Sequence, residues 1–294
     1  MKVLLTGARG QLGRALIAAA PQEVDLVATS RSELDLADSD ACFEAVRQNK
    51  PDWVLNAGAY TAVDKAESQP ELAYAVNMKA PKAFAEALRQ YGGRLLQIST
   101  DFVFDGTQGF PYRPDQKCAP LGVYGSSKAS GEEVIQEVLG DCGRALTLRT
   151  SWVIGPVGKN FVLTMLRLHR EQKQLRVVAD QVGCPTSTLN LSEACWRTIE
   201  FSNKKCLPSV MHWTDAGAAS WYDVAVSVGR IATELGLVNS AAVVNPITTV
   251  EYPTPAERPS YSLLDCSSTR VALELESEHW QKALFRVLQQ VKSF

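Results

Sequence analysis

Short apolar runs alternate with amphipathic helical patterns through the first half of this 294-residue chain. The apolar runs have strand length, and each is followed by a stretch with helical spacing of its apolar residues. The expected strands are 2–6, 23–29, 53–57, 93–98 and 145–149, and the expected helices include 39–48, 71–90 and 121–139. This alternation predicts an α/β fold with a doubly wound, Rossmann-like parallel sheet, in which ligands bind beyond the carboxyl ends of the strands.

The pattern changes after residue 152, where a glycine- and proline-containing loop interrupts the alternation. The elements expected beyond it are helices at 160–171, 188–201, 220–235 and 276–292 and strands at 175–178 and 210–213. We therefore expect a dinucleotide-binding domain at 1–152, to which elements near 185–215 return. Residues 153–294 would mainly form a smaller C-terminal substrate lobe. At 46% hydrophobic residues, the chain can bury both cores.

A glycine-rich turn joins the first expected strand to the first expected helix. Gly7, Gly10 and Gly13 have G-x-x-G-x-x-G spacing, which differs from the G-x-G-x-x-G of the usual dinucleotide fingerprint. The physical logic is the same, because glycines allow a tight turn, close approach to a pyrophosphate and close packing of helix on strand. The plainer alternative is an ordinary strand-to-helix turn. We expect the pyrophosphate of a dinucleotide to be lined by Gly7, Gly10, Gln11 and Leu12.

Tyr124 and Lys128 are four residues apart within one expected helix. Positions i and i+4 share a helix face, so the Lys128 ammonium is expected near the Tyr124 phenol. A nearby cation favours the phenolate and should lower the pKa of Tyr124 from about 10. Such a phenol could donate a proton to a carbonyl oxygen or remove one from an alcohol. The plainer alternative is an exposed lysine beside a half-buried ring.

Composition limits the classes of partner. A net charge of −2 and a pI of about 6.0 argue against nucleic acid. No apolar stretch approaches the roughly 18 residues that span a membrane, and the first strand leaves no room for a signal peptide. Seven scattered cysteines without Cys-x-x-Cys spacing are typical of reduced thiols in a cytoplasmic protein. With three histidines far apart, we predict no metal site.

Several segments together resemble the extended short-chain dehydrogenase/reductases and, within them, the dTDP-4-dehydrorhamnose reductase family. The broader resemblance rests on 6–13, 56–67, 99–106 and 124–128, and the narrower one on 149–153, 180–186 and 252–259. The resemblance covers nearly the whole chain, and its most specific motifs are 61–67 and 252–259. It implies NAD(P)H-dependent reduction of the 4-keto group of dTDP-4-dehydro-6-deoxy-L-mannose to dTDP-L-rhamnose.

The resemblance also implies a catalytic triad of Thr100, Tyr124 and Lys128. Tyr124 would protonate the carbonyl oxygen, Thr100 would hydrogen-bond the same oxygen, and Lys128 would bind the nicotinamide ribose. Ser99 is a competing hydroxyl. Because neighbouring residues of a strand point to opposite faces, only one of the two can reach the oxygen, and we expect it to be Thr100.

Cofactor preference depends on the residues that follow the second strand. Ser30 and Arg31 stand where an acidic residue would bind ribose hydroxyls, and an arginine there accommodates a 2′-phosphate, which favours NADPH. Members of the family accept both coenzymes, so NADH remains a second candidate. Asp35 and Leu36 match a pair that meets adenine in relatives, although Asp35 could equally be a turn residue. Small residues expected along the cofactor are Ala57, Gly58, Ala59 and Thr61.

The sugar nucleotide is expected to contact side chains from several segments. Val63, Phe102 and Trp152 are candidates around the hexose, together with Thr100 and Tyr124. Phe102 replaces a tyrosine that is common in relatives, and Trp152 could instead be a core residue. Arg258 could bind the diphosphate, because a guanidinium matches phosphate geometry, or could form a structural salt bridge.

Assembly and two rival functions are left open by the sequence. Some relatives are dimers bridged by a divalent cation on glutamates, but the first helix here begins Arg14-Ala15-Leu16 without a carboxylate. This supports the absence of a metal and leaves a homodimer undecided. One rival function is an epimerase or a reductase of another nucleotide-linked 4-keto sugar. The second is a non-catalytic NADP-binding regulatory subunit that resembles that of methionine adenosyltransferase.

Overall fold

A computed structural model describes residues 1–140 and 143–291 of the chain. Within these ranges, six parallel strands form one sheet in the order β10-β5-β4-β3-β1-β2. Their bounds are β1 Lys2–Thr6, β2 Asp25–Thr29, β3 Trp53–Asn56, β4 Arg94–Thr100, β5 Ala145–Thr150 and β10 Val210–His212. The strand order reverses direction between β1 and β3, which is the switch point at which doubly wound sheets bind ligands. The predicted doubly wound α/β sheet is confirmed.

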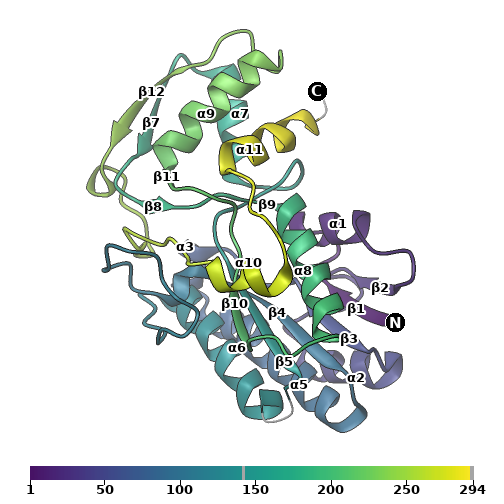
Figure 1. Ribbon diagram of the computed structural model, residues 1–294. Coiled ribbons are helices and arrows are strands. Elements are labelled where there is room, and N and C mark those ends of the chain that lie inside the picture. The colour runs from purple at the N-terminus through teal and green to yellow at the C-terminus, as the bar shows by residue number, and fades with distance from the viewer. Residues whose placement is uncertain (141–142, 292–294) are drawn as a thin grey trace.

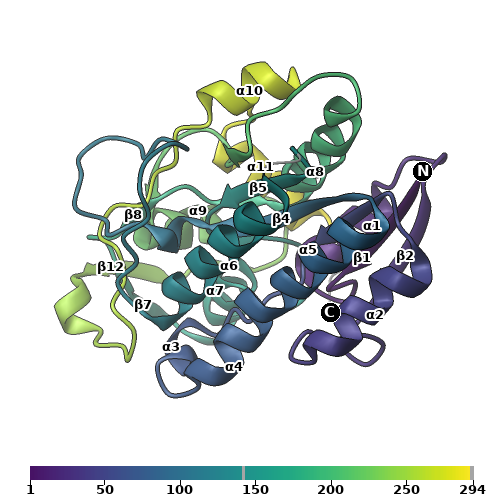
Figure 2. The ribbon, with the colours of Figure 1, turned by 90° about the horizontal axis from the view of Figure 1, so that it is seen from below.

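Helices cover both faces of this sheet because successive strand residues point to opposite sides (Figures 1 and 2). Val3 and Leu5 belong to a core with residues of α1, α8 and α10, whereas Leu4 belongs to a core with residues of α2, α5 and α6. The bounds of these helices are α1 Gln11–Ala18, α2 Ser39–Asn49, α5 Ala80–Tyr91, α6 Val123–Leu139, α8 Thr188–Ser202 and α10 Ser267–Leu273. The sheet is therefore buried on both faces, as parallel sheets usually are.

The helix expected over 71–90 is not a single α-helix. It consists of α4 (Pro70–Tyr74), a π-helical turn, η1 (Ala75–Lys79), and α5. The buried Asn77 lies in the π turn, and its side chain hydrogen-bonds the backbone of Tyr60 at both its N–H and its carbonyl. A π turn adds one residue to the helix, and such turns are frequent at functional sites. Helical periodicity alone did not reveal it.

The C-terminal half contributes a second core above the sheet, as Figure 1 shows. Its main elements are α7 Phe161–Glu171, β7 Gln174–Val178, α9 Trp221–Glu234, β12 Val243–Ile247 and α11 Trp280–Gln289. β12, for which no element was expected, pairs in parallel with β7, and its Pro246 is tolerated because both strands are edges of a two-stranded sheet. α11 ends before the expected position, and residue 292 lies outside the described residues.

Short elements complete the connections between the two cores. They are α3 Val63–Ala66, η2 Asp101–Val103, β6 Val153–Ile154, β8 Val182–Gly183, β9 Thr186–Ser187, β11 Ala219–Ser220 and η4 Thr249–Glu251. β6 follows β5 directly and pairs with β9, so the chain leaves the carboxyl edge of the sheet and enters the C-terminal core at once. Among the helices of the described residues, none is long and apolar enough to cross a lipid bilayer.

Candidate active site

The glycine turn after β1 is tightly packed against its neighbours. Gly7 has a left-handed backbone (φ +72°), and a Cβ there would lie 2.8 Å from the Cα of Gly58. A Cβ at Gly13 would lie 2.1 Å from the carbonyl oxygen of Gly7. α1 begins behind this turn with Gly10 as its N-cap and without a side-chain hydrogen bond at the cap. Its first N–H groups can therefore bind a phosphate, so the turn fits the pyrophosphate of a dinucleotide.

Substitution of Gly13 tests this turn. We expect Gly13→Ala to raise the dissociation constant for NADPH by at least about tenfold and to lower the free energy of unfolding by about 1–3 kcal/mol, because the added methyl must displace backbone. Fluorescence titration and urea unfolding would measure these effects. Gly109→Ala is the matched control, since nothing lies within 4 Å of a Cβ at Gly109. Wild-type affinity in Gly13→Ala would contradict the packing argument.

A series of side-chain hydrogen bonds, here called the polar ladder, runs across the carboxyl ends of β1, β3 and β4. The Thr6 hydroxyl donates to Asn56 Oδ1 (2.5 Å) and accepts from the Gly58 N–H (3.0 Å). Asn56 Nδ2 donates to Gln97 Oε1 (2.7 Å), and Gln97 Nε2 donates to the Ile98 carbonyl. The ladder thus connects the glycine turn with β4 and ends at Ile98, two residues before Thr100.

The residues after β2 form a compact turn. Glu33 accepts hydrogen bonds from both the N–H and the hydroxyl of the buried Ser30 (2.7 Å each), and these bonds lower the pKa of Glu33. Arg31 is exposed and lies 3.6 Å from Asp35, whose carboxylate also accepts from a turn N–H. Leu36 packs on Gly58. The predicted adenosine residues therefore adjoin the glycine turn, and Glu33 is an additional carboxylate there that the sequence did not single out.

Thr100 and Tyr124 meet at the carboxyl end of β4. The Tyr124 ring packs edge-to-face on Phe102, with 5.6 Å between the ring centroids. Burial raises the pKa of the Tyr124 phenol, and the Thr100 hydroxyl is close enough to oppose part of this rise. The Ser99 hydroxyl is instead buried without a hydrogen-bond partner among the described residues. The structure thus brings Thr100, rather than Ser99, to the phenol.

The expected lowering of the pKa of Tyr124 by Lys128 is wrong, because the pKa is raised and Lys128 is not among the groups that shift it. Burial raises the pKa of Tyr124 to about 12, and the Asp101 carboxylate adds to this rise. Lys128 is buried, and its ammonium donates to the Ile98 carbonyl at 2.6 Å. Burial lowers the pKa of Lys128 to about 8, against an opposing contribution from Glu132. The helix spacing was right, but a buried ammonium needs an acceptor and takes one from β4.

Two residues that the sequence did not identify hold α6 in place. Asn77 Nδ2 donates to the Ser127 hydroxyl (3.0 Å), which in turn donates to the Tyr124 carbonyl (2.8 Å). Glu67, directly after α3, accepts from the N–H of Val123 (2.9 Å) and satisfies an otherwise unpaired donor of the first turn of α6. The turn that carries Tyr124 is therefore fixed from both sides.

The two most specific sequence motifs bind each other. Arg258 donates to both carboxylate oxygens of Asp64 (3.0 and 2.8 Å) and to the carbonyl of Ala256 (3.0 Å). Arg258 also lowers the pKa of Asp64. The pair fastens the 252–259 turn to α3, which begins at Val63. The structure thus places Arg258 in a salt bridge, and diphosphate binding by Arg258 stays a prediction.

Trp152 occupies an unusual backbone conformation at the end of β5. Its φ is +45°, which is strained for a bulky residue. The indole stacks on Trp221 at 3.6 Å between ring centroids, with 6° between the planes. A Cβ at Gly183 would lie 2.6 Å from the same indole. One face of the ring is therefore covered by α9, which limits the surface that Trp152 could offer to a hexose.

A buried ion pair lies behind the site. Arg149 on β5 donates to both carboxylate oxygens of Glu132 on α6 (2.6 to 3.0 Å), and both side chains are about 95% buried, at 5% and 6% exposure. Arg149 also donates to the Pro114 carbonyl (3.3 Å) and lies 3.3 Å from His212 Nε2. Burial lowers the pKa of His212 to about 3. Nδ1 of this neutral ring lies 3.1 Å from the Tyr112 carbonyl and therefore carries the proton.

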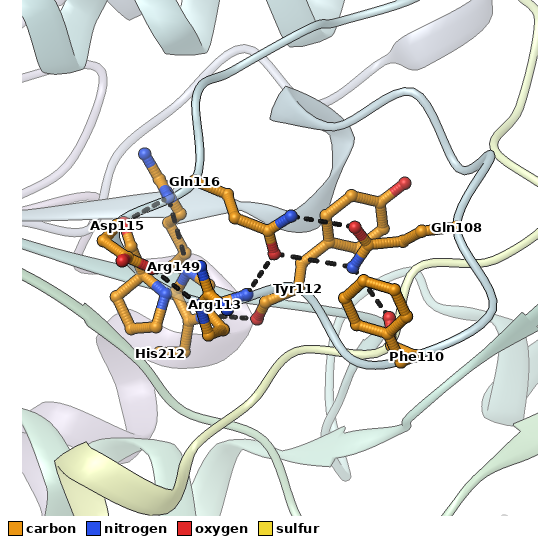
Figure 3. A network of polar contacts seen from close by, with 9 residues as sticks. Gln108, Phe110, Tyr112, Arg113, Asp115, Gln116, Arg149 and His212 are labelled. Carbon is orange, nitrogen blue, oxygen red and sulfur yellow. Dashed lines mark hydrogen bonds and ion pairs between the residues drawn. The ribbon is translucent and has the colours of Figure 1, made fainter.

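This network fastens the loop at 105–118 to the sheet (Figure 3). Figure 3 shows Gln116 between Gln108 and Arg113, with Arg149 and His212 beneath the loop. Tyr112 stacks on Phe104 at 4.2 Å between centroids. The loop that follows Thr100 and Phe102 thus has a defined position. Within the described residues, no three His, Cys, Asp or Glu side chains gather as a metal site would require.

Comparison with known proteins identifies relatives along the whole chain. The model of the RmlD substrate binding domain family matches residues 1–293. A dTDP-4-dehydrorhamnose reductase of Aggregatibacter actinomycetemcomitans is 37% identical over 287 residues, covering 96% of this chain and 97% of that protein.

Two solved structures are similar to the chain in fold and sequence. The crystal structure of a dTDP-4-dehydrorhamnose reductase from Clostridium acetobutylicum has a TM-score of 0.90 and 36% identity, and covers 98% of this chain and 99% of that one. The corresponding reductase from Bacillus anthracis, solved in complex with NADP, has a TM-score of 0.89 and 32% identity at the same coverage. The similarity therefore includes both cores, not the nucleotide-binding fold alone.

Proposed function

The chain belongs to the RmlD substrate binding domain family, and from that membership we propose that it is an NADPH-dependent reductase that converts dTDP-4-dehydro-6-deoxy-L-mannose to dTDP-L-rhamnose. One observation carries the proposal. Thr100, Tyr124 and Lys128 converge at the carboxyl end of β4, at the end of a polar ladder that starts at a glycine turn built for a pyrophosphate.

Different residues of the chain would bind different parts of NADPH. The turn of Gly7, Gly10, Gln11 and Leu12 would hold the pyrophosphate, while Arg31 would pair with the 2′-phosphate. Ala57 and Gly58 allow a close approach, and Lys128 would donate to the nicotinamide ribose. Bound there, NADPH supplies a hydride to C4 of the sugar.

The proton comes from Tyr124. Negative charge develops on the sugar carbonyl oxygen during reduction, and the phenol donates its proton to that oxygen. The raised pKa of Tyr124 keeps the phenol protonated at neutral pH, which suits a proton donor. A positioned donor of this kind contributes about 10²- to 10⁴-fold to the rate. The Phe102 ring packs edge-to-face on the Tyr124 ring. The Thr100 hydroxyl would hydrogen-bond the oxygen on which the negative charge develops.

The direct test measures NADPH absorbance with purified protein and freshly generated dTDP-4-dehydro-6-deoxy-L-mannose, with identification of the product by NMR. We expect stoichiometric loss of NADPH and formation of dTDP-L-rhamnose. NADPH binding without oxidation would refute the proposal and favour the regulatory-subunit alternative. An epimerase would rearrange the sugar without net consumption of NADPH, and oxidation with a different keto sugar only would indicate another reductase.

Assembly and compartment stay predictions. The sequence predicts a cytoplasmic location and leaves a homodimer open, and the site described above lies within one chain. Sedimentation of the purified protein at several concentrations would decide between monomer and dimer.

A further inference from the structure

Asp101 is a buried carboxyl group next to Thr100 that the mechanism above does not use. Its exposed fraction is 2%, and it begins η2. Its Oδ1 accepts a hydrogen bond from the Thr100 hydroxyl at 3.0 Å. Its Oδ2 is buried without a hydrogen-bond partner among the described residues, although the nearby Ser262 hydroxyl stabilises the charged form in part. A carboxylate with one unsatisfied oxygen in the interior requires an explanation.

The Thr100 hydroxyl has one proton, and two different acceptors compete for the single hydrogen bond that it can donate. A hydroxyl can donate one hydrogen bond and accept two. Thr100 Oγ1 already accepts from the N–H of Phe102 (3.2 Å) and donates to Asp101. Stabilising the phenolate that Tyr124 becomes when it gives up its proton, or binding a carbonyl oxygen, also requires Thr100 to donate. The proton that Asp101 holds is therefore the one that the proposed reaction needs.

We propose that Asp101 is a positioning residue that sets the direction of the Thr100 hydroxyl. As a carboxylate, Asp101 holds the Thr100 proton away from the substrate. As a carboxylic acid, it donates its own proton to the free lone pair of Thr100 Oγ1, and the Thr100 proton then points to Tyr124 and to the sugar carbonyl oxygen. The inference rests on the proposed reductase function and adds a group whose protonation state controls it.

The surroundings of Asp101 allow this exchange near neutral pH. Burial raises the pKa of Asp101 to about 6, while the nearby hydroxyls of Ser262 and Thr100 and the N–H groups of Asp101 and Phe102 oppose the rise. From α6, the titratable group that faces Asp101 is Tyr124, whose own pKa the carboxylate raises. The neighbours on β4, η2 and the segment after β12 are the uncharged Thr100, Phe102 and Ser262. The acid form therefore predominates below about pH 6.

The test is the pH dependence of turnover between pH 5.5 and 8.5 at constant ionic strength. In the wild type, kcat should fall about tenfold per pH unit above about pH 6, until the residual rate of the ionised form is reached. Asp101→Asn should lack this fall and should match or exceed the wild type at pH 8, because the amide can donate to Thr100 at every pH. Asp115→Asn, which removes an exposed carboxylate, is the matched control and should keep the wild-type profile.

The double variant shows whether Asp101 acts through Thr100. Thr100→Val should also lack the fall in kcat above about pH 6, although Asp101 is intact. Adding Asp101→Asn to Thr100→Val should cause no further change in the pH profile. Thr100→Val also tests the idea if Asp101→Asn does not fold. A wild-type profile in either single variant would overturn the inference, as would an equal effect of Asp101→Asn with and without Thr100. Absence of turnover in the wild type would instead refute the reductase function itself.

Discussion

Replacing Tyr124 by phenylalanine should lower kcat for the keto sugar by about 10³-fold while NADPH binding stays within about twofold of the wild type. The substitution removes the phenol that meets Thr100 at the carboxyl end of β4 and keeps the ring that packs on Phe102. Its effect should therefore be confined to proton donation. Single-turnover oxidation of NADPH measures the chemical step, and fluorescence titration measures cofactor binding.

Tyr91→Phe provides the matched control for this substitution. Tyr91 ends α5 just before the amino end of β4, whereas the site lies at the carboxyl end of β4, and the Tyr91 ring contacts Phe43, a contact that phenylalanine preserves. We expect wild-type turnover in this variant. If Tyr124→Phe kept kcat within tenfold of the wild type, another group would have to supply the proton, and the mechanism would fail.

The second large effect is expected at the buried Arg149–Glu132 pair. Arg149→Met should lower the free energy of unfolding by about 3–5 kcal/mol, because it leaves the Glu132 carboxylate buried and unpaired. The same change removes the guanidinium from the Pro114 carbonyl and from His212. Urea unfolding monitored by circular dichroism would measure the loss.

A double variant separates the cost of an unpaired charge from the loss of packing. Arg149→Met combined with Glu132→Gln removes both charges, so it should be more stable than Arg149→Met alone. Replacing a buried ion pair by neutral groups is often close to neutral in stability, whereas removing one partner is costly. A single variant within about 1 kcal/mol of the wild type would show that the pair is hydrated or readily rearranged.

Features encoded in contiguous sequence could be predicted. The glycine turn depends on residues within one short segment, and strand alternation sets which residues face each core. The doubly wound sheet followed from them, whereas the family and the cofactor class followed from the motifs that carry the family resemblance. Alternation implied that only one of Thr100 and Ser99 could reach the oxygen, and the resemblance favoured Thr100. The Thr100 hydroxyl lies near the Tyr124 phenol, and its catalytic role stays a prediction.

Features that depend on distant partners could not be predicted. The Lys128 ammonium binds the carbonyl of Ile98, 30 residues earlier, so the helix spacing gave the right face and the wrong partner. Asp64 and Arg258 are 194 positions apart, and each motif was recognised without the contact that joins them. The role of Asn77 was hidden because it requires a π turn in a segment whose periodicity looks α-helical. Local patterns carry no information about such contacts.

The polar ladder also determines whether the entropic cost of ordering these active-site side chains belongs to folding or to ligand binding. Each of its members has a fixed donor and acceptor role, from the Thr6 hydroxyl through Asn56 and Gln97 to the Ile98 carbonyl, which Lys128 also binds. These bonds form when the protein folds and need no ligand. The rotamer entropy that the side chains lose is therefore a cost of folding and not of association. The cofactor meets a preorganised surface, and its binding energy remains available to position the nicotinamide.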